Sequence, residues 1–236
     1  MKKSKNKNNM FKKIFVKAVK VLIVIISFSL LQVIILNWIN PFSSSIIIQR
    51  HVKSFFSGKK PIRYEWVKYE DISKQMVLAV ISSEDQNFPS HFGFDIDQIS
   101  KALKENRKRQ RGASTITQQV AKNMFLWNGK SFIRKGLEAY YTAALELLCS
   151  KKRIIEVYLN IAEMGDNIFG VEAVSKMYFT KKPKLLSAEE SALIASILPR
   201  PAKFSINHPS EYIKKRQVWI LDQMSQLGGV DYIKDL

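Results

Sequence analysis

The residues best suited to catalysis lie in one stretch, between Ala79 and Leu103. An acidic pair, Glu84 and Asp85, follows the apolar run Met76-Val77-Leu78-Ala79-Val80-Ile81. That run predicts a buried helix, because apolar residues recur near a 3.6-residue spacing. Glu84 would then emerge at the helix end, where a carboxylate in front of an apolar wall can act as a general acid or base. The alternative is a glutamate that only faces solvent, since most acidic side chains are exposed.

A second candidate site is cationic. Residues 115–118 match a capping box, which predicts a helix from there to about residue 126. The small residues 112–114 before it would let backbone amides face outward as an anion seat, helped by the helix dipole. Gln118 and Lys122 lie one turn apart and add a donor and a positive charge. These features favour a phosphate-type ligand. The basic run 105–112 is equally consistent with substrate contact and with a solvated surface.

The N-terminal region contains a predicted membrane span. Residues 1–20 hold eight lysines and no acid, and 29 uncharged residues lie between Lys20 and Arg50. The run from residue 21 to residue 39 would be about 28 Å long as a helix, which matches the hydrocarbon core of a bilayer. Trp38 falls where aromatic side chains favour the interface.

This pattern predicts the organisation of the chain. By the positive-inside rule, residues 1–20 form a cytoplasmic basic tail and residues 21–39 a transmembrane helix. Residues 40–60 are expected to be a linker and residues 61–236 a domain outside the cytoplasm. The alternative is a cleaved signal peptide, but the apolar run is longer than a usual signal core and no A-x-A tripeptide follows.

The composition of the chain limits the kinds of binding partner that are expected. The formal net charge of +18 favours polyanions such as nucleic acid, anionic lipid or a phosphorylated substrate. The predicted orientation argues against nucleic acid. Cys149 is the only cysteine, so it forms no internal disulfide, and its apolar neighbours predict that it is buried. The three histidines are scattered and no metal-ligand spacing occurs, so no metal site is predicted.

The predicted domain is predominantly α. Further helices are expected after Asp95 or Asp97, and over residues 134–148, 151–164, 188–199 and 212–226, with one short extended piece near residues 63–66. The segment Met124–Ile133 combines aromatic and apolar residues with interleaved cations. It fits either contact with a membrane interface or a hairpin folded onto the core.

Several longer motifs, taken in order, carry a family resemblance. They are Glu84-Asp85-Gln86-Asn87-Phe88 with His91-Phe92-Gly93, Arg111-Gly112-Ala113-Ser114-Thr115-Ile116-Thr117-Gln118-Gln119, Arg134-Lys135-Gly136-Leu137-Glu138 and Lys152-Arg153-Ile154-Ile155-Glu156-Val157-Tyr158-Leu159-Asn160. The chain resembles the peptidoglycan glycosyltransferase family over about residues 60–205, most closely its monofunctional, membrane-anchored form. Ala113, where the family often has glycine, and the segment 173–175 are minor departures.

The resemblance implies a lysozyme-like helical domain with a small membrane-proximal lobe, after one transmembrane helix. It implies transfer of a growing polyprenyl-pyrophosphate-linked glycan onto the 4-hydroxyl of lipid II, with inversion and formation of β-1,4 bonds. Glu84 is the implied base and Glu138 the second carboxylate. The implied pyrophosphate site comprises Ser114, Gln118, Lys122, Arg134 and Lys135.

The resemblance also implies a place in the cytoplasmic (inner) membrane, with the domain on its periplasmic side and in contact with membrane lipids. It leaves open whether a divalent cation, Mg²⁺ or Mn²⁺, binds as a cofactor and whether the chain contacts other cell-wall synthesis proteins. Two alternatives remain from other classes of protein. One is a lytic transglycosylase or lysozyme-like hydrolase, which needs no pyrophosphate site. The other is a non-catalytic membrane adaptor, which needs no pair of glutamates.

Overall fold

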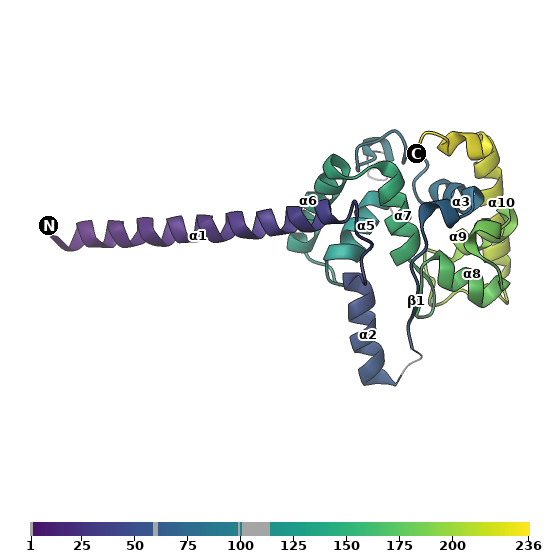
Figure 1. The fold of residues 1–236 in the computed structure, drawn as a ribbon, viewed down its shortest axis with the longest axis horizontal. Coiled ribbons are helices and arrows are strands. Elements are labelled where there is room, and N and C mark those ends of the chain that lie inside the picture. The colour runs from purple at the N-terminus through teal and green to yellow at the C-terminus, as the bar shows by residue number, and fades with distance from the viewer. Residues whose placement is uncertain (1, 59–60, 99, 101–113) are drawn as a thin grey trace. The chain divides into compact units, whose positions relative to one another are not determined.

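The computed structural model describes residues 2–58, 61–98, 100 and 114–236 (Figure 1). The chain divides into two compact units, Met1–Ile39 and Asn40–Leu236. The predicted basic run 105–112 lies outside the described residues, as does most of the helix expected after Asp95. The start of that helix is described, and Asp95 rather than Asp97 caps it, because Asp95 Oδ1 accepts from the Gln98 N–H at 2.8 Å.

The first unit is one long helix, α1 (Lys2–Ile35). Among the described residues, its segment Lys12–Ile35 is the one stretch long and apolar enough to cross a membrane. The helix ends at Ile35, before the predicted end at residue 39. The backbone and side-chain amides of Asn37 both donate to the Ile34 carbonyl, at 3.1 and 3.4 Å. Such local bonds compete with the regular helical pattern.

The second unit begins with a helix where the sequence predicts a linker. Helix α2 (Ser45–Ser57) occupies most of residues 40–60. Ser44 caps its start by accepting from the Ile47 N–H, and Gly58 ends it in the left-handed conformation at φ +61°. A serine before a helix and a glycine after it are the usual caps. The stretch expected to be a linker is therefore mostly helical.

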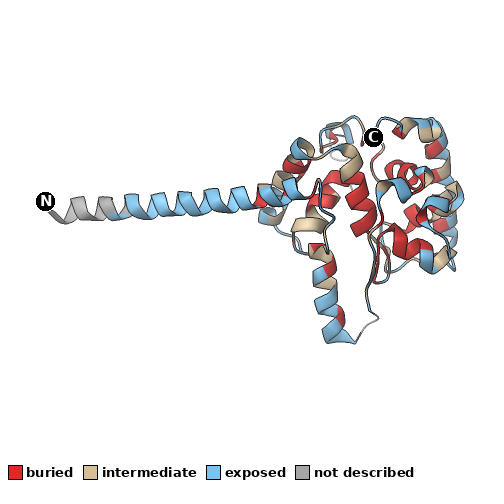
Figure 2. Cartoon of the chain, in the orientation of Figure 1, coloured by how far each residue is buried: buried red, intermediate tan, exposed pale blue. Residues whose placement is uncertain are grey.

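Four helices form the core of the second unit (Figures 1 and 2): α3 (Lys74–Glu84), α5 (Ile116–Phe125), α7 (Lys151–Ile161) and α9 (Ala188–Ile197). Helix α3 is buried from Met76 to Ser82, as its apolar run predicts, and packs on α9, while α5 packs on α7. The predicted capping box at Thr115 is formed, and a second capping box, at Ser187, starts α9. The predominantly α architecture is therefore confirmed.

The outer elements are α6 (Phe132–Leu148), α8 (Val171–Phe179), α10 (Glu211–Gln226) and the 3-10 turns η1 (Tyr69–Asp71), η2 (Pro183–Leu185) and η3 (Gly229–Ile233). The predictions for residues 134–148 and 212–226 are confirmed, with slightly earlier starts. Cys149 is only half-buried, contrary to prediction, because it caps the C-terminal end of α6 at the domain surface.

A small sheet joins the lead-in segment to the end of α7. Its strands are β1 (Arg63–Tyr64), β2 (Glu163–Gly165) and β3 (Ile168–Phe169), in the order β1-β3-β2. β1 runs parallel to β3, and β2 runs antiparallel to it. Because residues 163–165 form β2, α7 ends at Ile161 and not at the predicted residue 164. The buried side chain of Asn160 donates to and accepts from the Val67 backbone, at 2.9 and 2.8 Å. This pair of bonds fixes the lead-in segment against α7.

Candidate active site

The carboxylate of Glu84 is held at the end of α3 by side chains from three helices. Ser83 donates to Glu84 Oε1 at 3.1 Å, and Nε2 of Gln119, in α5, donates to Glu84 Oε2 at 3.0 Å. A guanidinium nitrogen of Arg216, in α10, lies 3.7 Å from Oε1. The side chain is 15% exposed, so the carboxylate is accessible while its direction is fixed. A general base needs both properties.

Gln119 is oriented in turn by Tyr158 of α7. The Tyr158 hydroxyl donates to Gln119 Oε1 at 3.5 Å, which leaves the Gln119 amide nitrogen facing Glu84. Burial, with the negative charges of Glu84 and Asp85 as smaller causes, raises the pKa of Tyr158 well above its usual value. The hydroxyl therefore stays protonated and donates at neutral pH.

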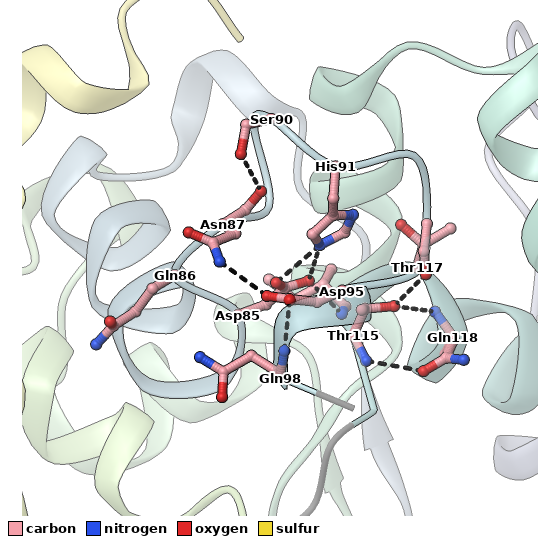
Figure 3. Close-up of polar contacts among 12 residues, drawn as sticks. Asp85, Gln86, Asn87, Ser90, His91, Asp95, Gln98, Thr115, Thr117 and Gln118 are labelled. Carbon is pink, nitrogen blue, oxygen red and sulfur yellow. Dashed lines mark hydrogen bonds and ion pairs between the residues drawn. The ribbon is translucent and has the colours of Figure 1, made fainter. Parts of the chain in front are cut away.

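The second member of the acidic pair, Asp85, has a structural role (Figure 3). It is buried, and Asp85 Oδ2 accepts from the N–H of Ile116, the first residue of α5, at 2.9 Å. Nε2 of His91 lies 2.8 Å from Asp85 Oδ1. These contacts connect the end of α3 to the start of α5, and so set the position of Gln119 relative to Glu84.

The loop after α3 is fixed by further polar contacts, several of them visible in Figure 3. The Thr115 hydroxyl donates to the Gly93 carbonyl at 2.7 Å, and Asn87 donates to Asp95 at 2.9 Å. Lys151 donates to the His91 carbonyl at 2.6 Å. The aromatic, turn-rich segment that follows Glu84 is thus a scaffold for the start of α5.

A second, cationic group of side chains surrounds Glu138 of α6. Glu138 is buried and accepts from Arg134, one turn earlier, at 2.8 Å, and also from Lys135. Arg134 Nε donates to the Gly129 carbonyl at 2.7 Å, so its guanidinium is held at both ends. The structure therefore brings together the predicted residues Arg134, Lys135 and Glu138.

Lys122 lies within electrostatic range of both carboxylates. Burial lowers the pKa of its ammonium group, while the charge of Glu138, and to a smaller extent that of Glu84, opposes this effect. Arg134 and Lys135 add to the lowering. No carboxylate among the described residues forms an ion pair with Lys122. A half-buried ammonium group without such a partner is able to receive an anionic ligand.

The structure gives Gln118 a different main role from the predicted one. Gln118 Oε1 accepts from the Thr115 N–H at 3.0 Å and completes the capping box, so only the amide nitrogen is left for a ligand. The predicted anion seat at the start of α5 also differs, because the Ile116 N–H already donates to Asp85. Ser114 is exposed immediately before the helix, and the amides of residues 112–113 lie outside the described residues.

A cleft of about 200 Å³ extends beside these groups. Its lining includes Gln119 and Lys122 of α5, Tyr158 of α7 and Arg50 of α2. Arg50 also forms an ion pair with Glu163, another lining residue, at 2.7 Å. The cleft is therefore lined by two cations and one carboxylate, and its lining residue Gln119 contacts Glu84 directly.

Gln119, Tyr158 and Arg216 are not among the site residues predicted from the sequence. Gln119 and Tyr158 lie inside the motifs that carry the resemblance, and this was the available signal. Arg216 lies 132 positions after Glu84 and is brought to it only by the packing of α10 on α3. Over residues 2–58, 61–98, 100 and 114–236, no group of three or more His, Cys, Asp or Glu side chains is placed to hold a metal ion.

Comparison with known proteins gives consistent matches. The family model described as Transglycosylase matches residues 50–225. A biosynthetic peptidoglycan transglycosylase of Pseudomonas entomophila is 47% identical over 211 residues, covering 88% of this chain and 89% of the relative. The protein of the same name from Pectobacterium atrosepticum is 46% identical over 222 residues, or 92% and 91% of the two chains. That of Cronobacter sakazakii is 51% identical over 199 residues, or 82% and 81%.

Proposed function

Because this chain belongs to the transglycosylase family and is a peptidoglycan glycosyltransferase, we propose that it joins two lipid-linked substrates with Glu84 as the base. The acceptor is lipid II, and the donor is a growing glycan on a polyprenyl pyrophosphate. The observation that carries this proposal is the environment of Glu84, whose accessible carboxylate is aimed by Gln119 and Arg216. Lys122 lies within electrostatic range of Glu84 and of the second carboxylate, Glu138.

In the proposed reaction, the acceptor's 4-hydroxyl attacks the anomeric carbon of the donor. The new C–O bond forms as the bond to the pyrophosphate oxygen breaks, which inverts the anomeric centre. The hydroxyl proton passes to Glu84, because a sugar hydroxyl is a weak nucleophile until its proton is removed. The pyrophosphate leaves with the bonding electron pair.

The leaving group needs positive charge as the bond breaks. Lys122, Arg134 and Lys135 supply it, since charge-assisted bonds to a phosphate are stronger than neutral ones. Ser114 and the amide nitrogen of Gln118 add hydrogen bonds. We assign Glu138 to positioning, because its carboxylate accepts from both Arg134 and Lys135 and so keeps the two cations together.

The chain is membrane-anchored through α1, and we propose that it lies in the cytoplasmic membrane with residues 1–20 in the cytoplasm. The eight lysines of that segment support this orientation. The catalytic domain is then periplasmic, where it meets lipid-linked substrates and membrane lipids. Other cell-wall synthesis proteins are further proposed partners.

Polymerisation of purified lipid II by the full chain tests the assignment of Glu84. Glu84→Gln keeps the shape and removes the base, so turnover should fall by about 10² or more. Glu211→Gln is the matched control, because Glu211 is an exposed glutamate on α10 and should leave turnover unchanged. A Glu84→Gln variant within a few-fold of wild type would move the base elsewhere, with Glu138 the next candidate. Cleavage of finished peptidoglycan in place of lipid II polymerisation would identify the hydrolase instead.

A further inference from the structure

Helix α2 packs on its domain with several polar side chains facing inward. Gln49 donates to the Leu126 carbonyl at 3.1 Å and accepts from the Asn128 N–H at 2.9 Å. Arg50 pairs with Glu163 at 2.7 Å, and the buried Ser54 hydroxyl accepts from Asn167 at 3.1 Å. Four contacts of this kind attach α2 to the domain through hydrogen bonds and one ion pair.

The outward face of the same helix is apolar. Ile48, Val52, Phe55 and Phe56 follow the i, i+4, i+7, i+8 spacing of one helical stripe, and all four are exposed. The two phenylalanines are 84% and 83% exposed, and their rings meet edge to face at 5.5 Å. A surface helix in water has the opposite arrangement, with its apolar side toward the core. A continuous stripe of this kind marks a contact surface.

The position of α2 in the chain indicates what covers this stripe. Nine residues separate the end of α1, the membrane-crossing helix, from the start of α2. Charge gives the same indication, because Lys53 is exposed on α2, Lys59 and Lys60 follow the helix in the sequence, and the chain has no acid before Glu65. An apolar stripe flanked by cations is the composition of helices that lie in the surface of an anionic bilayer.

We propose that α2 is an in-plane membrane helix, with Ile48, Val52, Phe55 and Phe56 at the boundary between headgroups and acyl chains of anionic lipid. Ile46 and Arg50, on its other side, line the cleft. The helix therefore separates the cleft from the bilayer, and it places the cleft at the depth of the lipid headgroups. The inference rests on the membrane anchoring of the chain and extends beyond the proposed chemistry of Glu84.

Site-specific fluorescence on the full chain tests this proposal. In a Cys149→Ser background, Val52→Cys or Phe55→Cys each carries an environment-sensitive probe, and the protein is reconstituted into phosphatidylethanolamine–phosphatidylglycerol vesicles. Lys214→Cys on α10 is the matched control, since Lys214 is exposed and far along the chain from α2. Probes at positions 52 and 55 should emit at shorter wavelength and lose most of their intensity to acyl-chain spin-labelled lipid. The probe at position 214 should be quenched only by aqueous iodide.

Three results would count against the proposal. Probes at positions 52 and 55 that respond to iodide as the control does would show a face open to water. Probes shielded from iodide and lipid alike, with cross-links between chains, would show a protein partner instead. Equal lipid quenching in phosphatidylcholine vesicles would remove the requirement for anionic lipid. Lipid II polymerisation by the same labelled chains in detergent is measured separately, so a failure of the catalytic assignment is distinguishable from a failure of docking.

Discussion

The Asp85 carboxylate accepts the first backbone N–H of α5, from Ile116, at 2.9 Å, one residue after the proposed base. This single bond joins the helix that ends in Glu84 to the helix that carries Gln119 and Lys122. The acidic pair therefore divides its roles. Glu84 is accessible to substrate, and Asp85 fixes the distance between the base and the side chains of α5.

Asp85→Asn should therefore reduce both stability and turnover. An asparagine keeps the shape, but it is neutral and weakens the contacts to Ile116 and His91. Loss of a charge-assisted, buried hydrogen bond costs about 1.5–3 kcal/mol, so the melting temperature should fall by several degrees. Asp222→Asn, an exposed aspartate on α10, is the control and should melt like wild type. Unchanged melting and turnover in Asp85→Asn would show that the helix start does not depend on this carboxylate.

Lys122 should show a conflict between stability and activity. Burial lowers the pKa of Lys122, so the charged form is less stable in the folded protein than in the unfolded chain. Lys122→Met removes that cost and should stabilise the domain by about 0.5–2 kcal/mol. Turnover should fall about 10-fold or more, because a charge-assisted contact to pyrophosphate is lost.

The pH dependence checks the cause of this stabilisation. The folded-state pKa of Lys122 lies below its ordinary value of 10.5, so the folded protein releases this proton at lower pH than the unfolded chain. Stability of wild type should rise relative to Lys122→Met as the pH passes through the folded pKa toward 10.5. Lys234→Met, at an exposed lysine, should show no such convergence. A difference in stability that stays constant with pH would assign the effect to packing.

Arg216 should act on turnover through Glu84. Its guanidinium donates to Ser83 at 3.0 Å and lies 3.7 Å from Glu84, so it restrains the end of α3. Arg216→Gln should lower kcat about 10-fold with little change in KM, because substrate contacts are kept while the base is less well aimed. Arg216→Lys, which keeps the charge, should recover part of the loss. A rise in KM with constant kcat would instead place Arg216 in substrate binding.

The sequence predicts features that depend on local patterns. The apolar spacing before Glu84 predicts the buried helix α3, and the residues around Thr115 and Ser187 predict two helix starts. The interaction of Glu84 with Arg216 is not predictable in this way, because it depends on how α10 packs on α3. The strands β2 and β3 are too short to show alternation. Helix α2 had its signals in Ser44 and Gly58, but its apolar residues face outward and give no core-facing pattern.

The segment between α5 and α6 carries the last prediction, which concerns contact with lipid. The sequence leaves two alternatives for residues 124–133, and the structure separates them by residue. Phe125 stacks on Tyr141 with ring centroids 4.4 Å apart, so it packs against the domain. Trp127, Phe132 and Ile133 are exposed, and Phe132 is 98% exposed. The three exposed side chains are therefore the ones free to enter a membrane interface.

Changing Trp127, Phe132 and Ile133 together to Ser should weaken binding of the unit Asn40–Leu236 to anionic vesicles by about 10-fold or more, since each loses apolar surface that lipid would cover. The melting temperature should stay close to that of wild type, because these side chains leave no cavity. The matched control changes Leu147, Leu185 and Val218, which are also exposed, to Ser and should bind vesicles like wild type. A folded Trp127, Phe132 and Ile133 variant that co-sediments with vesicles as wild type does would exclude this segment from docking and leave α2 as the contact. A variant that melts much earlier would show that these side chains support the fold.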